Sequence, residues 1–189
     1  MKEVLHKLVF EFAVFRGNTR GSGTWLTGVD ITLQGILGVQ EGKEVAHTFD
    51  ISRTGYYFTE LGLDAYDFWG SKYSDIDQYA QTNQTLLNKK AMIYPYYRDP
   101  VSLKVMTEPP ANWTKVTDPV TWDSSTDRAA YIKKYSELYP NNGYNWSGSV
   151  THIHHIRPLI YGGTNAFSNL IPLPANFHIY TVTPWWNSY

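Results

Sequence analysis

The chain has 189 residues, which at roughly 150 residues per domain predicts one sizeable domain, or a small module with an accessory part. Its residues are 42% hydrophobic and 16% aromatic, which excludes a disordered chain and predicts a globular protein. Its 16 basic and 17 acidic residues give a net charge of -1, so it lacks the basic excess of a protein that holds nucleic acid mainly by charge. It contains no cysteine, which excludes disulfides, thiolate nucleophiles and cysteine-bound zinc.

Polar residues interrupt the apolar start of the chain, MKEVLHKLVFEFAVF, at Glu3, His6, Lys7 and Glu11. This stretch is therefore neither a signal sequence nor a membrane span, and no later stretch approaches the ~20 apolar residues that a span needs. We expect a protein with no membrane partner, and any export signal would lie outside this sequence.

The first 120 residues are predicted to form a β-rich accessory or core region. Short apolar or alternating stretches between Lys7 and about Phe58 are separated by glycine-containing turns, which is typical of strands. The segment 79–90, YAQTNQTLLNKK, has a polar, helix-like composition but weak periodicity. Five of the ten prolines lie between Pro95 and Pro119, which predicts an irregular connector and a domain boundary at 120/121.

The part after that boundary, 121–189, is predicted to begin with a helix. Serine and aspartate capping residues precede apolar side chains at near-helical spacing, and Pro140 stops the pattern, which predicts a helix over about 125–139. Together with the β-rich first part, this helix makes the predicted fold class α+β.

A strand, loop, strand and helix are predicted to follow. Residues 150–156, VTHIHHI, alternate as a strand does, so His152 and His154 share one face while His155 points to the other. Gly162 and Gly163 permit a tight reversal, the segment 169–173 gives a short second strand, and the sequence PANFH begins a helix that carries His178.

Histidines are concentrated in this part of the chain. Four of the six fall within 27 residues, whereas residues 138–189 contain no Asp or Glu and Arg157 is their only formal cation. A metal site here would have to use imidazole and amide ligands, which suits zinc, nickel, cobalt or manganese. Magnesium would also fit if water and substrate phosphate completed its coordination.

These residues resemble a known family. His154-His155, Asn169 and His178, with the GG loop and NLIPL between them, are similar in order and spacing to the HNH, or ββα-metal, nuclease motif. The wider string HHIRPLIYGGTNAFSNLIPLPANFH, followed by a Trp pair, is similar to the C-terminal nuclease domains of bacterial polymorphic toxins. The resemblance covers about residues 144–189.

The resemblance implies a role for each matching residue. His154 and His178 would hold one divalent cation, and His155 would be the general base that takes a proton from water. Asn169 would brace the loop and orient the backbone of that base. An imidazole with an ordinary pKa of about 6.5 can generate a nucleophile at neutral pH, and a cation supplies the Lewis acid.

The resemblance leaves open the third metal ligand and the role of Arg157. The histidine that colicin-type members carry four residues after the helix histidine is replaced by Val182. Water and phosphate would complete the coordination, or His152 or Asn187 would enter it. Arg157 is a candidate phosphate contact and is grouped with the catalytic residues, while surface placement explains it equally well.

We therefore expect a metal-dependent HNH endonuclease that hydrolyses phosphodiester bonds in DNA with one divalent ion, Mg, Mn, Zn or Ni. It would be the toxin domain of a larger antibacterial effector that is secreted or delivered into the cytoplasm of a target bacterium, with a cognate immunity protein as partner. The alternatives are an RNA-cleaving HNH toxin and a non-catalytic, aromatic-rich binding module, for which 15 Tyr and 7 Trp would be suitable.

Overall fold

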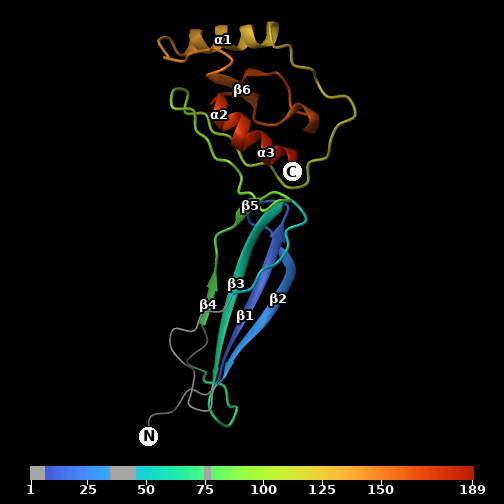
Figure 1. The fold of residues 1–189 in the computed structure, drawn as a ribbon, viewed down its shortest axis with the longest axis vertical. Helices are drawn as coiled ribbons and strands as arrows, with labels where there is room; N and C mark the ends of the chain where they lie inside the picture. The colour runs from blue at the N-terminus through green and yellow to red at the C-terminus, as the bar shows by residue number, and fades with distance from the viewer. Residues whose placement is uncertain (1–6, 35–45, 75–77) are drawn as a thin grey trace. The chain divides into compact units, whose positions relative to one another are not determined.

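A computed structural model describes residues 7–34, 46–74 and 78–189 (Figure 1). The protein is α+β, as predicted, with a mostly antiparallel sheet and few helices. Its contacts divide it into two compact units, Met1–Leu87 and Asn88–Tyr189. Among the described residues, no helix is both long and apolar enough to cross a membrane.

The first unit is an antiparallel sheet. Its strands are β1 (Lys7–Gly17), β2 (Thr24–Gln34), β3 (Gly55–Tyr66), β4 (Gln78–Gln81) and β5 (Thr85–Leu87). The described strands follow the order β2-β1-β3-β4, and β5 also pairs with β3. The predicted β-rich character of this region is confirmed, but the helix-like composition of 79–90 was misleading, because β4 and β5 both pair with β3.

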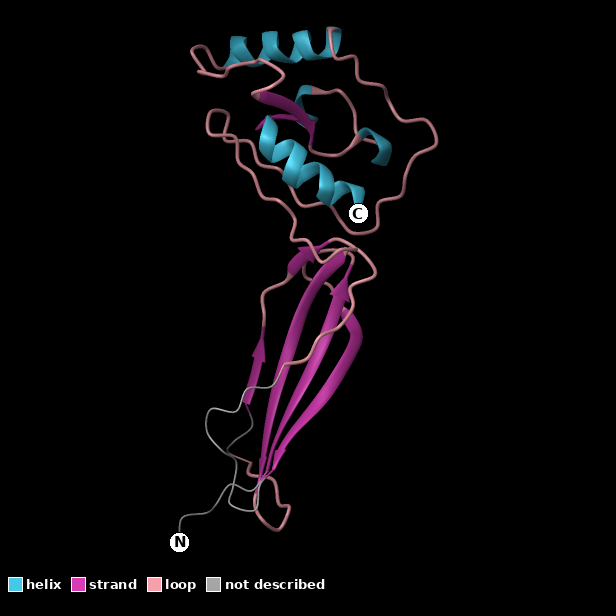
Figure 2. Cartoon of the chain, in the orientation of Figure 1, coloured by secondary structure: helices cyan, strands magenta, loops and turns pink. Residues whose placement is uncertain are grey.

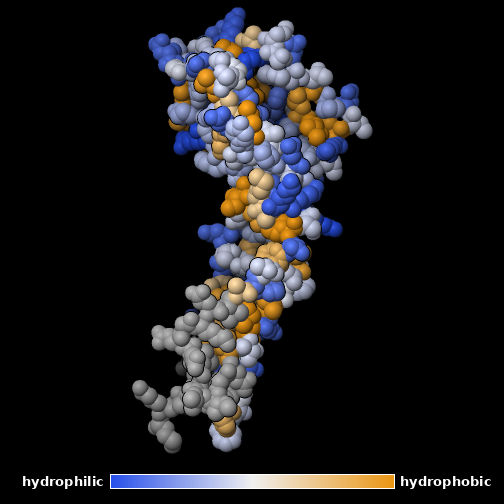
Figure 3. Space-filling model, viewed as in Figure 1, coloured by the Kyte–Doolittle hydropathy of each residue, from blue (hydrophilic) through white to orange (hydrophobic). Residues whose placement is uncertain are grey.

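A stacked aromatic pair joins β1 and β3. Phe15 of β1 lies opposite Phe58 of β3, and their rings stack with centroids 4.9 Å apart. Several large apolar side chains are nevertheless exposed on this unit, among them Trp25 and Trp69, which are 63% and 86% exposed. Figure 3 shows apolar side chains reaching the surface over the sheet.

The second unit surrounds a small hairpin with helices (Figure 2). Its elements are α1 (Thr126–Leu138), β6 (Thr151–His155), the 3-10 turns η1 (Leu159–Tyr161) and η2 (Phe167–Asn169), β7 (Leu170–Pro174), and a helical segment made of α2 (Ala175–Phe177), η3 (His178–Val182) and α3 (Thr183–Asn187). Strands β6 and β7 pair antiparallel, with His154 opposite Ile171. The predicted helix over about 125–139 and the strand-loop-strand-helix order are confirmed.

The boundary between the units differs from the predicted one at 120/121. Residues 88–125 contain no helix or strand, as expected of a proline-rich connector, yet they belong to the second unit. The Asn88 side chain donates to the Trp185 carbonyl at 3.0 Å, and the Trp185 indole donates to the Met92 carbonyl at 3.0 Å. The C-terminal Tyr189 accepts a hydrogen bond from the Trp113 backbone at 3.0 Å. Trp185 is fully buried, so the C-terminal Trp pair packs the connector onto the helix.

Aromatic side chains fill the space between α1 and the hairpin. Tyr131 and Tyr135 of α1 are buried against Leu170 of β7, with Phe167 stacked on Tyr131 at 5.1 Å. Ser125, the residue before the first helical residue, makes no capping bond with its side chain, but Asp123 accepts from the Thr126 backbone N–H at 2.9 Å. This packing fixes the N-terminus of α1 beside the loop of the hairpin.

A buried carboxylate joins the connector to this aromatic core. Asp99 is fully buried and accepts hydrogen bonds from the hydroxyls of Tyr135 (2.5 Å), Tyr144 and Ser102. Burial alone would raise the pKa of Asp99, but the hydrogen bonds from Ser102 and the two tyrosines outweigh it and hold the pKa below its ordinary value. Asp99 therefore stays ionised and ties the connector to α1.

Candidate functional site

Three histidines meet between β6 and the helical segment that follows β7. His152 and His154 lie two residues apart on β6 and both contact His178, which confirms that they share one face of the strand. The His154 Nδ1 and His178 Nε2 atoms are 3.1 Å apart. On the other side of the His178 ring, its Nδ1 lies 3.1 Å from the Nδ1 of His152.

A widened turn carries His178. The helical segment continues through η3, a π turn in which the Thr183 N–H bonds to the His178 carbonyl five residues back. Pro184 follows at once, and its ring would clash with the carbonyl four residues before it in a regular helix. The wider turn leaves room for the Pro184 ring. His178 is the first residue of this turn and lies opposite β6. Such π turns occur often at functional sites.

Burial keeps the paired histidines neutral. His154 is only 6% exposed, and burial followed by the proximity of His178 lowers its pKa far below the ordinary value. Burial also lowers the pKa of His178, with His152 as the next cause. A metal ligand must be a neutral imidazole, so both side chains are in the form that binds a cation. His154 Nε2 is buried and finds no hydrogen-bond partner among the described residues.

His155 faces the opposite side of β6, as predicted, and is held by a chain of polar groups. Its Nε2 lies 3.0 Å from the Asn165 Oδ1 atom, and its ring stands edge-on to Trp122 at 5.0 Å. The Asn165 amide nitrogen donates to the Thr121 carbonyl at 2.8 Å and to the Asp127 carboxylate at 3.0 Å. These two acceptors fix the amide so that its oxygen faces His155.

The fixed amide assigns the two nitrogens of His155. An amide oxygen only accepts, so His155 Nε2 must carry a hydrogen, and the neutral ring then has its lone pair on Nδ1. Burial lowers the pKa of His155, while the Asn165 hydrogen bond and the charge of Asp127 oppose that shift. The lowered pKa favours a neutral ring at pH 7, which has a lone pair available to accept a proton.

Asn169 braces the loop that leaves β6. Its Oδ1 accepts from the Arg157 backbone N–H at 2.9 Å, and its Nδ2 donates to the carbonyls of Arg157 at 3.0 Å and Thr164 at 2.8 Å. A Cβ on Gly163 would lie 1.9 Å from the Arg157 carbonyl oxygen, so only glycine fits there. The loop conformation two residues beyond His155 therefore depends on Asn169 and Gly163.

One cavity is lined by three of the four clustered histidines. A hollow of about 220 Å³ is lined by His154, His155 and His178, together with Val182 and Asn187. Val182 is fully buried and apolar, so the position where the resemblance expects a third histidine supplies packing only. Asn187 reaches the same hollow, whereas His152 is not part of its lining. Among the described residues, no cluster of three or more His, Cys, Asp or Glu is arranged to hold a metal.

Arg157 lies in a different cavity. Its Nε donates to the Tyr161 carbonyl at 2.7 Å, and its guanidinium lies over the Trp113 ring at 4.8 Å. The surrounding hollow of about 440 Å³ is also lined by Lys104, Ser168 and Asn169, and none of the histidines lines it. The structure thus does not bring Arg157 into the histidine cavity.

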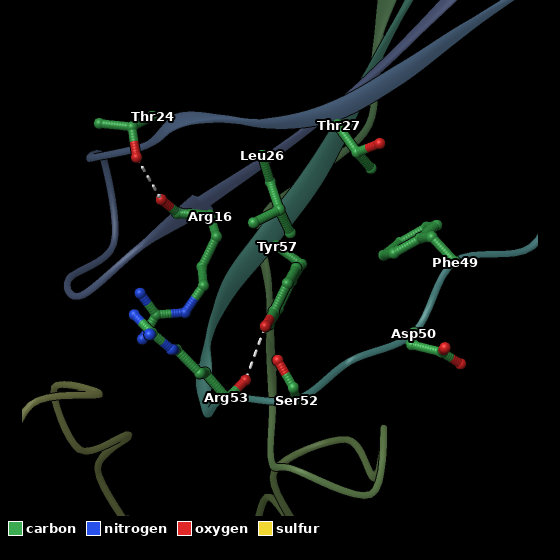
Figure 4. A pocket seen from close by; sticks show the side chains of 9 residues that line it. All are labelled: Arg16, Thr24, Leu26, Thr27, Phe49, Asp50, Ser52, Arg53 and Tyr57. Carbon is green, nitrogen blue, oxygen red and sulfur yellow. Dashed lines mark hydrogen bonds between the residues drawn. The ribbon is translucent and has the colours of Figure 1, made fainter.

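The first unit has an open pocket of its own (Figure 4). It measures about 550 Å³, and its lining includes Arg16 and Arg53. Arg16 is already engaged, because its Nη2 donates to the Thr54 carbonyl at 2.5 Å. Tyr57 donates to the Arg53 carbonyl at 2.6 Å. The lining therefore carries both signs of charge, with Asp50 in addition to the two arginines.

Sequence reasoning missed Asn165. It lies only ten residues after His155, but its contacts depend on the N-terminus of α1, which no local pattern reveals. One sequence feature points to Asn165: its amide side chain lies in a glycine-containing loop close to the histidines.

Comparisons of the chain with protein-family models, with curated proteins and with solved structures give no match.

Proposed function

We propose that the second unit is a metal-dependent HNH-type endonuclease that hydrolyses phosphodiester bonds in DNA with one divalent cation. The observation that carries this proposal is the pairing of His154 Nδ1 and His178 Nε2 at 3.1 Å at a cavity that His155 also lines. The hairpin β6-β7 is followed by a helical segment, and this strand-strand-helix order supports the proposal.

The histidine pair fits a metal ion. Two imidazole nitrogens that bind one zinc ion at about 2.0–2.1 Å, with an angle near 90–110°, are about 3 Å apart. The observed 3.1 Å agrees with that spacing, and both rings are neutral. The set offers two ligands only, so water and a substrate phosphate would complete the coordination. A bound cation would act as the Lewis acid that stabilises charge on the phosphate and on the leaving oxygen.

The remaining roles in the proposed reaction belong to protein side chains. His155 takes the proton of the attacking water at Nδ1, because Asn165 holds the hydrogen at Nε2. Asn165 and Trp122 prevent the ring from turning, and Asn169 fixes the loop that follows it. Val182 and Trp186 also line the histidine cavity.

The same resemblance supports a role as the toxin domain of a larger antibacterial effector that is delivered into a target bacterium. Residues 138–189 contain one arginine and no acid, so a bound cation would make this surface positive. Such a surface suits DNA, and it also suits an acidic immunity protein that covers the cavity in the producing cell.

The test is to incubate the purified chain with plasmid DNA and with total RNA, each with and without EDTA. We expect plasmid cleavage that EDTA abolishes. Cleavage of RNA alone would replace DNA by RNA as the substrate, and no cleavage of either by a folded, metal-loaded protein would leave a binding module.

The toxin role has separate tests. Expression of the chain alone should degrade bacterial chromosomal DNA, and the product of the adjacent downstream gene should copurify with it and inhibit cleavage. Normal growth in the presence of folded, metal-loaded protein would contradict the toxin role.

A further inference from the structure

We propose that His152 is a positioning residue for the metal ligand His178, which it holds in the tautomer whose Nε2 can bind the cation. The inference rests on the proposed function, since it names what supports one ligand of that site. The contacts that carry it run in a line from the Gly148 carbonyl, through His152 and His178, to His154.

The first step fixes the hydrogen on His152. Its Nε2 lies 2.9 Å from the Gly148 carbonyl oxygen, which can only accept a hydrogen bond. Nε2 must therefore carry the hydrogen, and a neutral ring has its lone pair on Nδ1.

The second step fixes the position of the hydrogen on His178. The two Nδ1 atoms of His152 and His178 are 3.1 Å apart, so a hydrogen bond between them needs a hydrogen on His178 Nδ1. His178 Nε2 is then left with a lone pair, and it lies 3.1 Å from His154 Nδ1. This is the nitrogen that a cation shared with His154 would bind.

The absence of acids from the nearby sequence leaves this place to another side chain. A metal-binding histidine commonly donates its second N–H to a carboxylate, a backbone carbonyl or water, which fixes its tautomer and its ring orientation. Residues 138–189 contain no Asp or Glu, so none of the side chains near His178 in sequence can be that carboxylate. His152 contacts the Nδ1 edge of His178 instead and is itself anchored on a backbone carbonyl.

The same geometry argues against His152 as the third ligand. It contacts the Nδ1 edge of the His178 ring, whereas His154 contacts the Nε2 edge. The two nitrogens of one imidazole point in different directions, so an ion at Nε2 lies out of reach of His152. His152 is also absent from the lining of the cavity that His154, His155 and His178 share.

Two substitutions of His152 distinguish the loss of its hydrogen-bond acceptor from the loss of side-chain volume. His152→Ala removes the acceptor, whereas His152→Asn keeps an amide oxygen near the former Nδ1 position. Loss of such a supporting contact typically weakens metal binding 10–100-fold. We therefore expect His152→Ala to weaken Zn²⁺ binding by about that factor and His152→Asn to restore most of the affinity.

The experiment combines nitrogen-15 NMR of the metal-free chain with calorimetric titration of Zn²⁺. In the parent and in His152→Asn, the spectrum should show His178 with its hydrogen on Nδ1, and His152→Ala should lose that preference. His178→Ala serves as the reference for loss of a ligand. If it leaves Zn²⁺ affinity unchanged, the proposed metal site itself is wrong.

Two outcomes would overturn the positioning role alone. The first is an affinity that falls in His178→Ala but not in His152→Ala. The second is a larger loss in His152→Ala than in His154→Ala, without recovery in His152→Asn, which would make His152 a direct ligand. A hydrogen on His178 Nε2 in the metal-free parent would also refute the proposed tautomer.

Discussion

Replacement of His155 by alanine tests the assignment of the general base. The substitution removes the only group that we expect to accept the proton of the attacking water, so cleavage should fall by about 10²–10⁴-fold. Zn²⁺ affinity should change little, because the side-chain hydrogen bond of His155 runs to Asn165 and not to His154 or His178.

The fold should survive this substitution. The lost hydrogen bond to Asn165 accounts for about 0.5–1.5 kcal/mol, and the lost edge-on contact with Trp122 accounts for a similar amount. The expected cost is therefore about 1–3 kcal/mol, against a total stability of about 5–15 kcal/mol for a typical protein. The variant can be assayed as a folded protein below its unfolding temperature.

The assay is the single-turnover rate of plasmid cleavage at saturating Zn²⁺ or Mn²⁺, with thermal unfolding measured in parallel. Tyr180→Ala is a matched control, because Tyr180 lies on the same helical segment as His178 and is 75% exposed. Cleavage by His155→Ala at the parental rate would show that another group activates the water.

Three further predictions concern the metal pair and the packing around it. His154→Ala and His178→Ala should each weaken Zn²⁺ binding in calorimetric titration, and excess cation should partly restore cleavage; unchanged affinity in both would place the site elsewhere. Gly163→Ala should lower the free energy of unfolding by about 1–3 kcal/mol, because the added Cβ would lie 1.9 Å from a backbone oxygen, and a parental urea midpoint would contradict this close approach. Asp99→Asn should destabilise the second unit at pH 7 by about 2 kcal/mol or more. Because the folded pKa of Asp99 lies below its unfolded value, its carboxylate contributes fully above about pH 4, and that contribution is lost as the pH falls through the folded pKa. The difference between parent and variant in urea unfolding should therefore shrink in acid, and a constant difference would refute this account.

Local patterns made the histidine hairpin predictable. The alternation of VTHIHHI placed β6 within a residue of its observed bounds and put His152 and His154 on one face, because side-chain direction in a strand follows from the backbone alone. The capping residues and Pro140 likewise located α1. Both elements depend on neighbours in sequence, which is why the sequence alone revealed them.

Long-range packing was not predictable in the same way. The proline-rich connector was correctly expected to be irregular, but its place in the second unit depends on bonds such as Asn88 to Trp185, 97 residues apart. Arg157 is a candidate phosphate contact by sequence, whereas its contacts with Tyr161 and Trp113 place it in another cavity than the histidines.

Asn165 shows what such packing adds to the candidate site, and it can be tested by a nearly isosteric change. Its amide nitrogen faces two acceptors, Thr121 O and Asp127 Oδ2, while its oxygen receives the hydrogen of His155 Nε2. In Asn165→Asp, an oxygen would replace that nitrogen and face both acceptors without a hydrogen to share. We expect a loss of about 1–3 kcal/mol in the free energy of unfolding, measured in urea at pH 7, although the volume of the side chain barely changes. A stability equal to that of the parent would mean that the amide is not fixed by these two acceptors, and the assignment of the His155 lone pair to Nδ1 would then lose its basis.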